Sequence, residues 1–92
     1  MNKCLKIMLN VSLKEGFMQN IVQKFARKFE LEGFVQVWAQ DQVKIIVCGE
    51  KGQVDSFVDL LHKESHKAHI ENIEIEPFLK DKDYRGVFRV IE

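Results

Sequence analysis

Hydrophobic and polar residues alternate along the start of the chain. Between residues 5 and 13 the apolar side of this pattern holds Leu5, Ile7, Leu9, Val11 and Leu13, and the other side holds Lys6, Met8, Asn10 and Ser12. Such alternation is typical of a strand with one buried face. The period then changes to that of a helix from Phe17 to Phe29, with an apolar side made of Met18, Val22, Phe25, Ala26 and Phe29. We expect this helix to end near Glu30, before Gly33.

The middle of the chain predicts a hairpin followed by a second helix. Residues 34–39 and 43–48 are rich in β-branched and aromatic side chains, and Gln40-Asp41-Gln42 separates them. This turn lacks glycine, so the sequence leaves its geometry open. After Gly49 and Gly52, apolar residues recur at helical spacing to about His66, namely Val54, Phe57, Val58 and Leu61.

Two further strands complete the pattern. Ile70, Ile73 and Ile75 indicate a fourth strand, and residues 87–91 indicate a short last strand after the polar turn at residues 80–83. The order predicts one α+β domain over residues 1–92, a ferredoxin-like βαββαβ sandwich. In this fold one antiparallel sheet carries two helices on one face, and the chain adds a short extra C-terminal strand.

Composition narrows the classes of partner. The 92 residues are 46% hydrophobic and 30% charged, and 14 basic side chains balance 14 acidic ones. A net charge of zero provides no field that would concentrate nucleic acid or an anionic membrane surface. No apolar run approaches the roughly 18 residues of a membrane span, and the first residues do not form a signal-peptide core. We therefore expect a cytoplasmic monomer with no nucleic-acid partner, no membrane partner and no cofactor.

Several short segments resemble the acylphosphatase family, and their order and spacing carry the resemblance over essentially the whole chain. Ala26 and Leu31-Glu32-Gly33-Phe34-Val35 resemble the end of the family's first helix and its Leu-x-Gly-Trp/Phe-Val entry to the second strand. Gly49, Val54 and Phe57 resemble the segment that follows the third strand, and Phe88-Arg89-Val90 resembles the closing Phe-x-Ile strand.

The resemblance implies hydrolysis of acyl phosphates to a carboxylate and phosphate. In the family the first loop reads roughly Gly-Arg-Val-Gln-Gly-Val-x-Phe-Arg, and its backbone amides and final arginine hold the substrate phosphate. Amides at a helix N-terminus stabilise an oxyanion, and a guanidinium adds bidentate, charge-assisted hydrogen bonds. An asparagine on the second strand orients the attacking water, so the reaction proceeds by positioning without a covalent intermediate.

The corresponding segment here, residues 11–20, contains no arginine. Counting back from Gly33 without a gap places Gln19 at the family's arginine position, and counting forward places Val37 at the asparagine position. If the loop holds a deletion, Gly16 takes the position of the family glycine and Asn20 that of the arginine. Glutamine has no charge, and valine neither donates nor accepts a hydrogen bond.

We therefore expect a weakly active or inactive acylphosphatase-like domain. One alternative is an active enzyme with a rearranged loop, and another is a non-catalytic module that binds an anion or a protein. An anion such as phosphate or an acyl phosphate would be held by the loop, mainly through the backbone of Lys14, Glu15, Gly16, Phe17, Met18, Gln19 and Asn20. Lys14 and Glu15 are equally compatible with a plain solvated turn.

Cys4 and Cys48 need separate consideration once the fold is assumed. In a ferredoxin-like sheet the first and third strands are antiparallel neighbours, so the two cysteines become candidates for a cross-strand disulfide on the face away from the helices. Some bacterial members of the family resemble this pattern. A cytoplasmic location favours two free thiols instead.

Two other clusters suggest chemistry more weakly. His62 and His66 lie one helical turn apart, which suits a zinc ion if a third ligand approaches, but histidines and lysines also complement the C-terminal end of a helix dipole. Phe34 and Trp38 suggest base stacking, but residues 5–12 and 43–48 contain no aromatic residue to complete an RNA-binding face. We therefore expect a solvated helix end, and we expect Trp38 to pack on the sheet.

Overall fold

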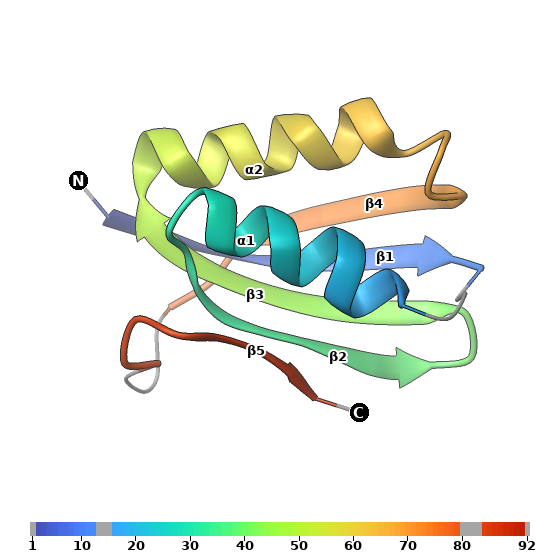
Figure 1. Ribbon diagram of the computed structural model, residues 1–92, viewed down its shortest axis with the longest axis horizontal. Helices are drawn as coiled ribbons and strands as arrows, with labels where there is room; N and C mark the ends of the chain where they lie inside the picture. The colour runs from blue at the N-terminus through green and yellow to red at the C-terminus, as the bar shows by residue number, and fades with distance from the viewer. Residues whose placement is uncertain (1, 13–15, 80–83, 92) are drawn as a thin grey trace.

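The computed structural model describes residues 2–12, 16–79 and 84–91. Leu13, Lys14, Glu15 and the turn predicted at residues 80–83 lie outside the described residues. The elements are β1 (Asn2–Val11), the π-helix η1 (Met18–Gln23), α1 (Lys24–Lys28), β2 (Glu32–Ala39), β3 (Gln42–Glu50), α2 (Lys51–Glu64), β4 (Ile70–Pro77) and β5 (Phe88–Ile91) (Figure 1). This order confirms the predicted α+β ferredoxin-like fold.

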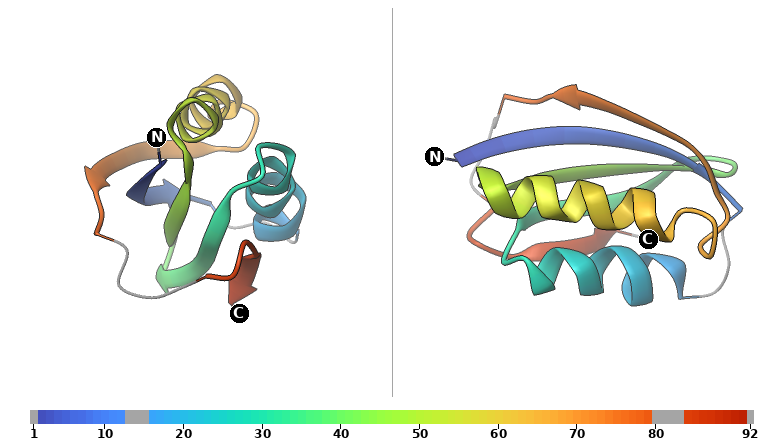
Figure 2. Two further views of the ribbon diagram at one scale, coloured as in Figure 1. Left: turned by 90° about the vertical axis from the view of Figure 1, so that its left-hand side faces the viewer. Right: turned by 90° about the horizontal axis from the view of Figure 1, so that it is seen from above.

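The five strands form one sheet in the order β4-β1-β3-β2-β5. The first four pair antiparallel, as predicted, whereas β5 pairs parallel with β2. The sheet is therefore mixed, and our expectation of a wholly antiparallel sheet is corrected at its last strand. The end-on view in Figure 2 shows that both helical segments cover the same face of the sheet.

Alternation along the strands separates the core from the open face. Ile7, Leu9 and Val11 of β1 are buried under the helices, as the sequence pattern predicts. The helix α2 contributes the fully buried side chains of Val54, Phe57 and Leu61, which recur at helical spacing. Burial of these apolar side chains is the main source of stability for a domain of this size. The family landmarks also serve this core, through buried Ala26, Leu31, Val35 and Phe88.

The first helical segment differs from the continuous α-helix predicted over residues 17–29. Its beginning is a π-helix, and only residues 24–28 are α-helical. Its predicted end is confirmed, because Glu30 adopts a left-handed conformation with φ of 56°. The Leu31 N–H then donates to the Ala26 carbonyl, and the Glu30 N–H donates to the Arg27 carbonyl, which together form a Schellman motif.

Four segments of the chain meet at one end of the molecule (Figure 1). They are the end of β1, the start of η1, the β2–β3 turn and the turn from α2 to β4. In the β2–β3 turn, Asp41 adopts the left-handed conformation that glycine usually supplies, with φ of 57°. Its carbonyl accepts a 2.9 Å hydrogen bond from the Val11 N–H, which ties this turn to the end of β1.

The chain end packs against the sheet through residues on both sides of the undescribed segment. The Phe78 N–H donates to the Cys4 carbonyl at 3.2 Å, next to β1. The Tyr84 N–H donates to the Glu32 carboxylate at 3.2 Å, and the Tyr84 ring lies 6.0 Å from the Phe34 ring. Phe78 therefore lies beside β1 and Tyr84 beside β2, and β5 pairs with β2 at the edge of the sheet.

Candidate functional site

The predicted anion loop is described from Gly16 onward. Gly16 has φ of 81°, a conformation that L side chains rarely adopt, and its carbonyl accepts a 2.7 Å hydrogen bond from the Asn20 N–H. A Cβ placed on Gly16 would lie 2.6 Å from Nδ2 of Asn20. The Asn20 amide group therefore packs over the backbone of the loop, and the positive φ of Gly16 favours glycine at this position.

Phe17 and Met18 both contribute to the hydrophobic core. Phe17 is buried, and Met18 is half-buried against the same cluster. Gln19 is exposed on η1. The predicted loop residues thus separate into two structural side chains, Phe17 and Met18, and two polar ones, Gln19 and Asn20.

The π-helix changes the residue count between the loop and β2. The Lys24 N–H donates to the Gln19 carbonyl, five residues earlier, where an α-helix would use a residue four earlier. A π turn consequently holds one more residue than an α turn. Compared with a continuous α-helix, the chain therefore needs one more residue to connect a position before this turn with a position after it.

Val37 lies near the end of β2 and pairs with Val43 of β3. It follows Val35 by two residues, so it points to the helix-covered face of the sheet, where η1 packs against β2. Val37 is 43% exposed because it lies at the rim of that cover. Its isopropyl group offers no hydrogen bond to a water or a phosphate.

The two cysteines form a disulfide. Cys4 of β1 and Cys48 of β3 are direct partners in the antiparallel register, and their Sγ atoms are 2.06 Å apart. The expectation of two free thiols is therefore wrong, because the register places the two side chains opposite each other on the open face. The bond lies near the start of β1 and so at the other end of the sheet from the loop.

The histidine and aromatic clusters also have definite places. The helix α2 ends at Glu64, between His62 and His66, and among the described residues no three His, Cys, Asp or Glu side chains are grouped to hold a metal ion. Trp38 is 58% exposed and not packed into the sheet as expected, and Nζ of Lys44 lies 4.9 Å from its ring centroid. Trp38 alternates with Val37 along β2 and contacts Lys44, so its ring lies on the sheet face that carries no helices.

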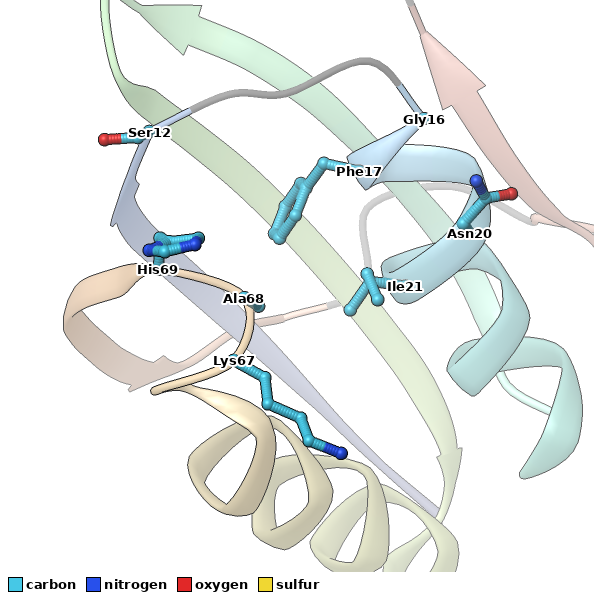
Figure 3. A pocket seen from close by; sticks show the side chains of 8 residues that line it. All are labelled: Ser12, Gly16, Phe17, Asn20, Ile21, Lys67, Ala68 and His69. Atoms are coloured by element: carbon cyan, nitrogen blue, oxygen red, sulfur yellow. The ribbon is translucent and has the colours of Figure 1, made fainter.

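A cavity of about 250 Å³ opens beside the loop (Figure 3). Its lining comes from the start of η1 and from the turn between α2 and β4, including Lys67 and His69. Sequence reasoning expected a solvated helix end at the nearby His62 and His66 and missed the cavity. No sequence signal could have located it, because residues 17 and 69 become neighbours only when the two helical segments pack on the same face of the sheet.

Comparisons with known proteins agree with this architecture. A profile of the acylphosphatase family matches residues 14–90, and the chain therefore belongs to the acylphosphatase family. A search among curated protein sequences gives no significant match. In the described part of the chain, no helix is both long and apolar enough to cross a membrane.

Solved structures resemble the whole chain. The acylphosphatase of Coxiella burnetii has a TM-score of 0.82 at 23% identity, covering 98% of this chain and 93% of that one. The acylphosphatase of Bacillus subtilis also has a TM-score of 0.82, at 20% identity, with both chains covered completely. Full-length HypF in its phosphate- and nucleotide-bound form gives 0.80 at 18% identity, and this chain corresponds to 12% of it. At these identities the structures establish the fold.

Proposed function

We propose that this protein is a diverged member of the acylphosphatase family in which hydrolysis of acyl phosphates is weak or absent. The observation that carries the proposal is the position of the arginines. The first arginine in the sequence is Arg27, which lies in the last turn of α1 and beyond the whole loop. No alignment register can therefore place an arginine at the start of the first helix.

Three residues of this chain are candidates for the position of the family's arginine. An ungapped count from Gly33 ends at Gln19, and a deletion in the loop moves the position to Asn20. The extra residue in the π turn has the opposite effect and moves it to Met18, because that residue precedes the wide turn. This last count also matches Phe17 with the phenylalanine that precedes the arginine in the family motif, so we favour it.

The chemistry of the three candidates leads to the same result. Neither a thioether nor a neutral amide provides the charge of a guanidinium, and Val37 cannot orient a water molecule. Removing one preorganised electrostatic donor from an active site typically costs about 3–4 kcal/mol of transition-state stabilisation. With two groups replaced, little rate enhancement is left.

Two alternatives follow from the same loop. Lys14 could serve as a point charge for phosphate in a rearranged loop, which would make the protein an active enzyme. The second alternative is a non-catalytic binding module. It binds either a protein or, through Gln19, Asn20 and the backbone amides of the loop, phosphate or an acyl phosphate without hydrolysing it.

A hydrolysis assay separates these functions. Purified protein is incubated with benzoyl phosphate, and the release of phosphate is compared with the spontaneous rate. We expect turnover at or only slightly above that background. Turnover well above it, lost in Lys14→Ala, would refute the proposal and establish the rearranged loop.

A rescue experiment tests the physical explanation. Val37→Asn is combined separately with Met18→Arg, Gln19→Arg and Asn20→Arg, and Lys28→Arg with Val37→Asn serves as a control that adds an arginine elsewhere on the helical segment. We expect a gain of roughly 10²-fold or more over the parent in the Met18→Arg pair. A gain confined to the Gln19→Arg pair would instead mean that no residue is inserted. If every pair folds and none gains activity, the two replacements are not the cause of inactivity.

A further inference from the structure

One edge of the sheet is an open strand. β4 is terminal in the sheet order, and among the described residues no strand pairs with its outer side (Figure 2). An unpaired edge presents a row of backbone N–H and C=O groups with which another chain can pair. What this edge can accept depends on the groups that it presents.

The hydrogen bond from the Phe78 N–H to the Cys4 carbonyl shows which residues of β4 face outward. Phe78 continues the antiparallel register of β4 with β1, so its backbone groups, and those of every second residue before it, point to β1. The backbone groups of Ile73, Ile75 and Pro77 consequently point away from the sheet. Pro77 has no N–H to offer, so the regular open edge is centred on Ile73 and Ile75.

The helix-covered side of this edge is apolar. Ile73 and Ile75 point to that side, because they pair with the buried Leu9 and Ile7 of β1. The helix α2 packs on β1 and β3, and Ile75 at the edge remains 40% exposed. A hollow of about 210 Å³ lies beside Ile73, below His62, and leaves room for a side chain of an added strand.

The other side of the edge is acidic. Glu74 and Glu76 are exposed on it, Glu71 is exposed at the bulge, and β4 contains no basic residue. Among the described residues one ion pair reaches this strand, from Lys6 to Glu76 at 3.5 Å. The edge therefore favours a basic partner. A second copy of this chain is disfavoured, because two paired β4 strands would place their glutamates side by side.

We propose that β4 binds an extended segment of a partner protein as an added antiparallel strand, in which basic residues alternate with apolar ones. The apolar side chains lie beside Ile73 and Ile75, and the basic side chains lie beside Glu74 and Glu76. Backbone hydrogen bonds provide affinity, and the two rows of side chains provide selectivity. This surface uses neither the first loop nor Val37, so it goes beyond the proposed loss of hydrolysis and does not depend on it.

A peptide of alternating lysine and valine tests strand addition on the full chain. In an antiparallel pair, the residues opposite Ile73 and Ile75 have side chains on the same face, so the valine N–H groups of the peptide point to β4 and its lysine N–H groups point to solvent. N-methylation of the valines should weaken binding at least about tenfold, and N-methylation of the lysines should change it by less than about twofold. Equal affinity of the two methylated peptides would overturn strand addition.

Amide hydrogen exchange locates the bound strand. The N–H groups of Ile73 and Ile75 have no strand partner among the described residues, so in the free protein they should exchange faster than those of Glu74 and Glu76. Saturating peptide should slow the exchange of Ile73 and Ile75 at least about tenfold. Protection confined to β5, at the opposite edge, or to the first loop would overturn the proposal.

Glu74→Lys tests the contribution of charge, with Glu30→Lys as its matched control. Both positions are exposed and both variants change the net charge equally, but Glu30 lies beside β5 at the opposite edge of the sheet. We expect Glu74→Lys to weaken binding of the lysine–valine peptide about fivefold or more, and Glu30→Lys less than about twofold. Equal losses would overturn the role of the acidic row.

Absence of binding of the unmethylated peptide to the wild-type protein would overturn the proposal as a whole. None of these readouts involves the release of phosphate, so failure of this surface and failure of the proposed function are distinguishable.

Discussion

At the scale of single residues, Gly33 shows why a family landmark recurs in this chain. It lies near the start of β2 with φ of 135°, and a Cβ there would be 1.9 Å from the Ile46 carbonyl oxygen. Its N–H donates to the Val87 carbonyl at 3.0 Å. Gly33 thus allows β3 to approach closely, and its N–H binds the residue that precedes β5. Only glycine fits both the close approach and the positive φ.

Gly33→Ala should therefore lower the free energy of unfolding by about 3 kcal/mol or more, because overpacking against backbone adds to conformational strain. Gly86→Ala is the matched control, since Gly86 also has a positive φ, of 68°, but nothing lies within 4 Å of its added Cβ. That variant should lose only about 1 kcal/mol. Urea unfolding followed by circular dichroism measures both, and equal losses would contradict the close-approach argument.

At the scale of elements, α2 is capped at its start and joined to β1 by an ion pair. The Glu50 side chain accepts a 3.2 Å hydrogen bond from the Gln53 N–H at the helix start. Asp55 binds Lys3 of β1 and Lys51 of its own helix. Hydrogen bonds from the Gly52 and Gln53 N–H groups lower the pKa of Glu50, and hydrogen bonds from Lys3 and then Lys51 lower the pKa of Asp55.

The pH dependence of stability follows from these two directions. A carboxyl whose pKa is lower in the folded state binds protons first in the unfolded state, so stability rises with pH across that interval. The contribution is fully present above the ordinary values of 4.5 for Glu50 and 3.8 for Asp55, and it is lost as the pH falls through the lowered values. We expect Glu50→Gln to be less stable than wild type at pH 7 and to lose less stability on acidification.

Denaturant unfolding between pH 7 and pH 3 measures this effect. The matched control is Glu71→Gln, which removes an exposed carboxylate from β4 at the same cost in net charge. If Glu50→Gln and Glu71→Gln change the loss of stability between pH 7 and pH 3 by the same amount, the Glu50 cap is not the source of that loss.

The disulfide is the second feature that acts between elements. It connects β1 with β3, and the two cysteines are 44 residues apart in the sequence. Closing a loop of that length reduces the entropy of the unfolded chain and is worth about 4 kcal/mol in the chain-entropy estimate. For a small domain this is a large share of the total stability.

Reduction should thus lower the free energy of unfolding by about 2–4 kcal/mol. Urea unfolding with and without a thiol reductant measures the change. The variant Cys4→Ala with Cys48→Ala is the control, because reductant should leave its stability unaltered. Identical stability of the oxidised and reduced wild type would show that the bond contributes nothing.

At the scale of the whole molecule, the features that stabilise the fold lie far from the candidate sites. The disulfide and the start of α2 lie at one end of the sheet, and the loop, Val37 and the cavity lie at the other (Figure 1). For this reason, reduction of the disulfide should leave the affinity of the loop for phosphate unchanged as long as the protein stays folded. The balanced charge of the chain leaves any preference for anions to local groups.

Most of the fold could be predicted from the sequence, because one-sided burial leaves a period along each element. The alternation in β1 and the helical stripe of Val54, Phe57 and Leu61 are confirmed by the burial of those residues. The wide turn in η1 could not be predicted, since an inserted residue keeps an apolar stripe recognisable while it shifts the count. The parallel pairing of β5 also escaped prediction, because its direction depends on where the preceding segment crosses.

The sequence by itself determined the order of elements, the family and the absence of arginine from residues 1–26. These features are local, or depend only on spacing. The tertiary structure alone decided the pairing of Cys4 with Cys48 and the meeting of Phe17 with Lys67 and His69 across one cavity. Such contacts join residues far apart in the chain, and strand register and helix packing, which no local pattern encodes, bring them together.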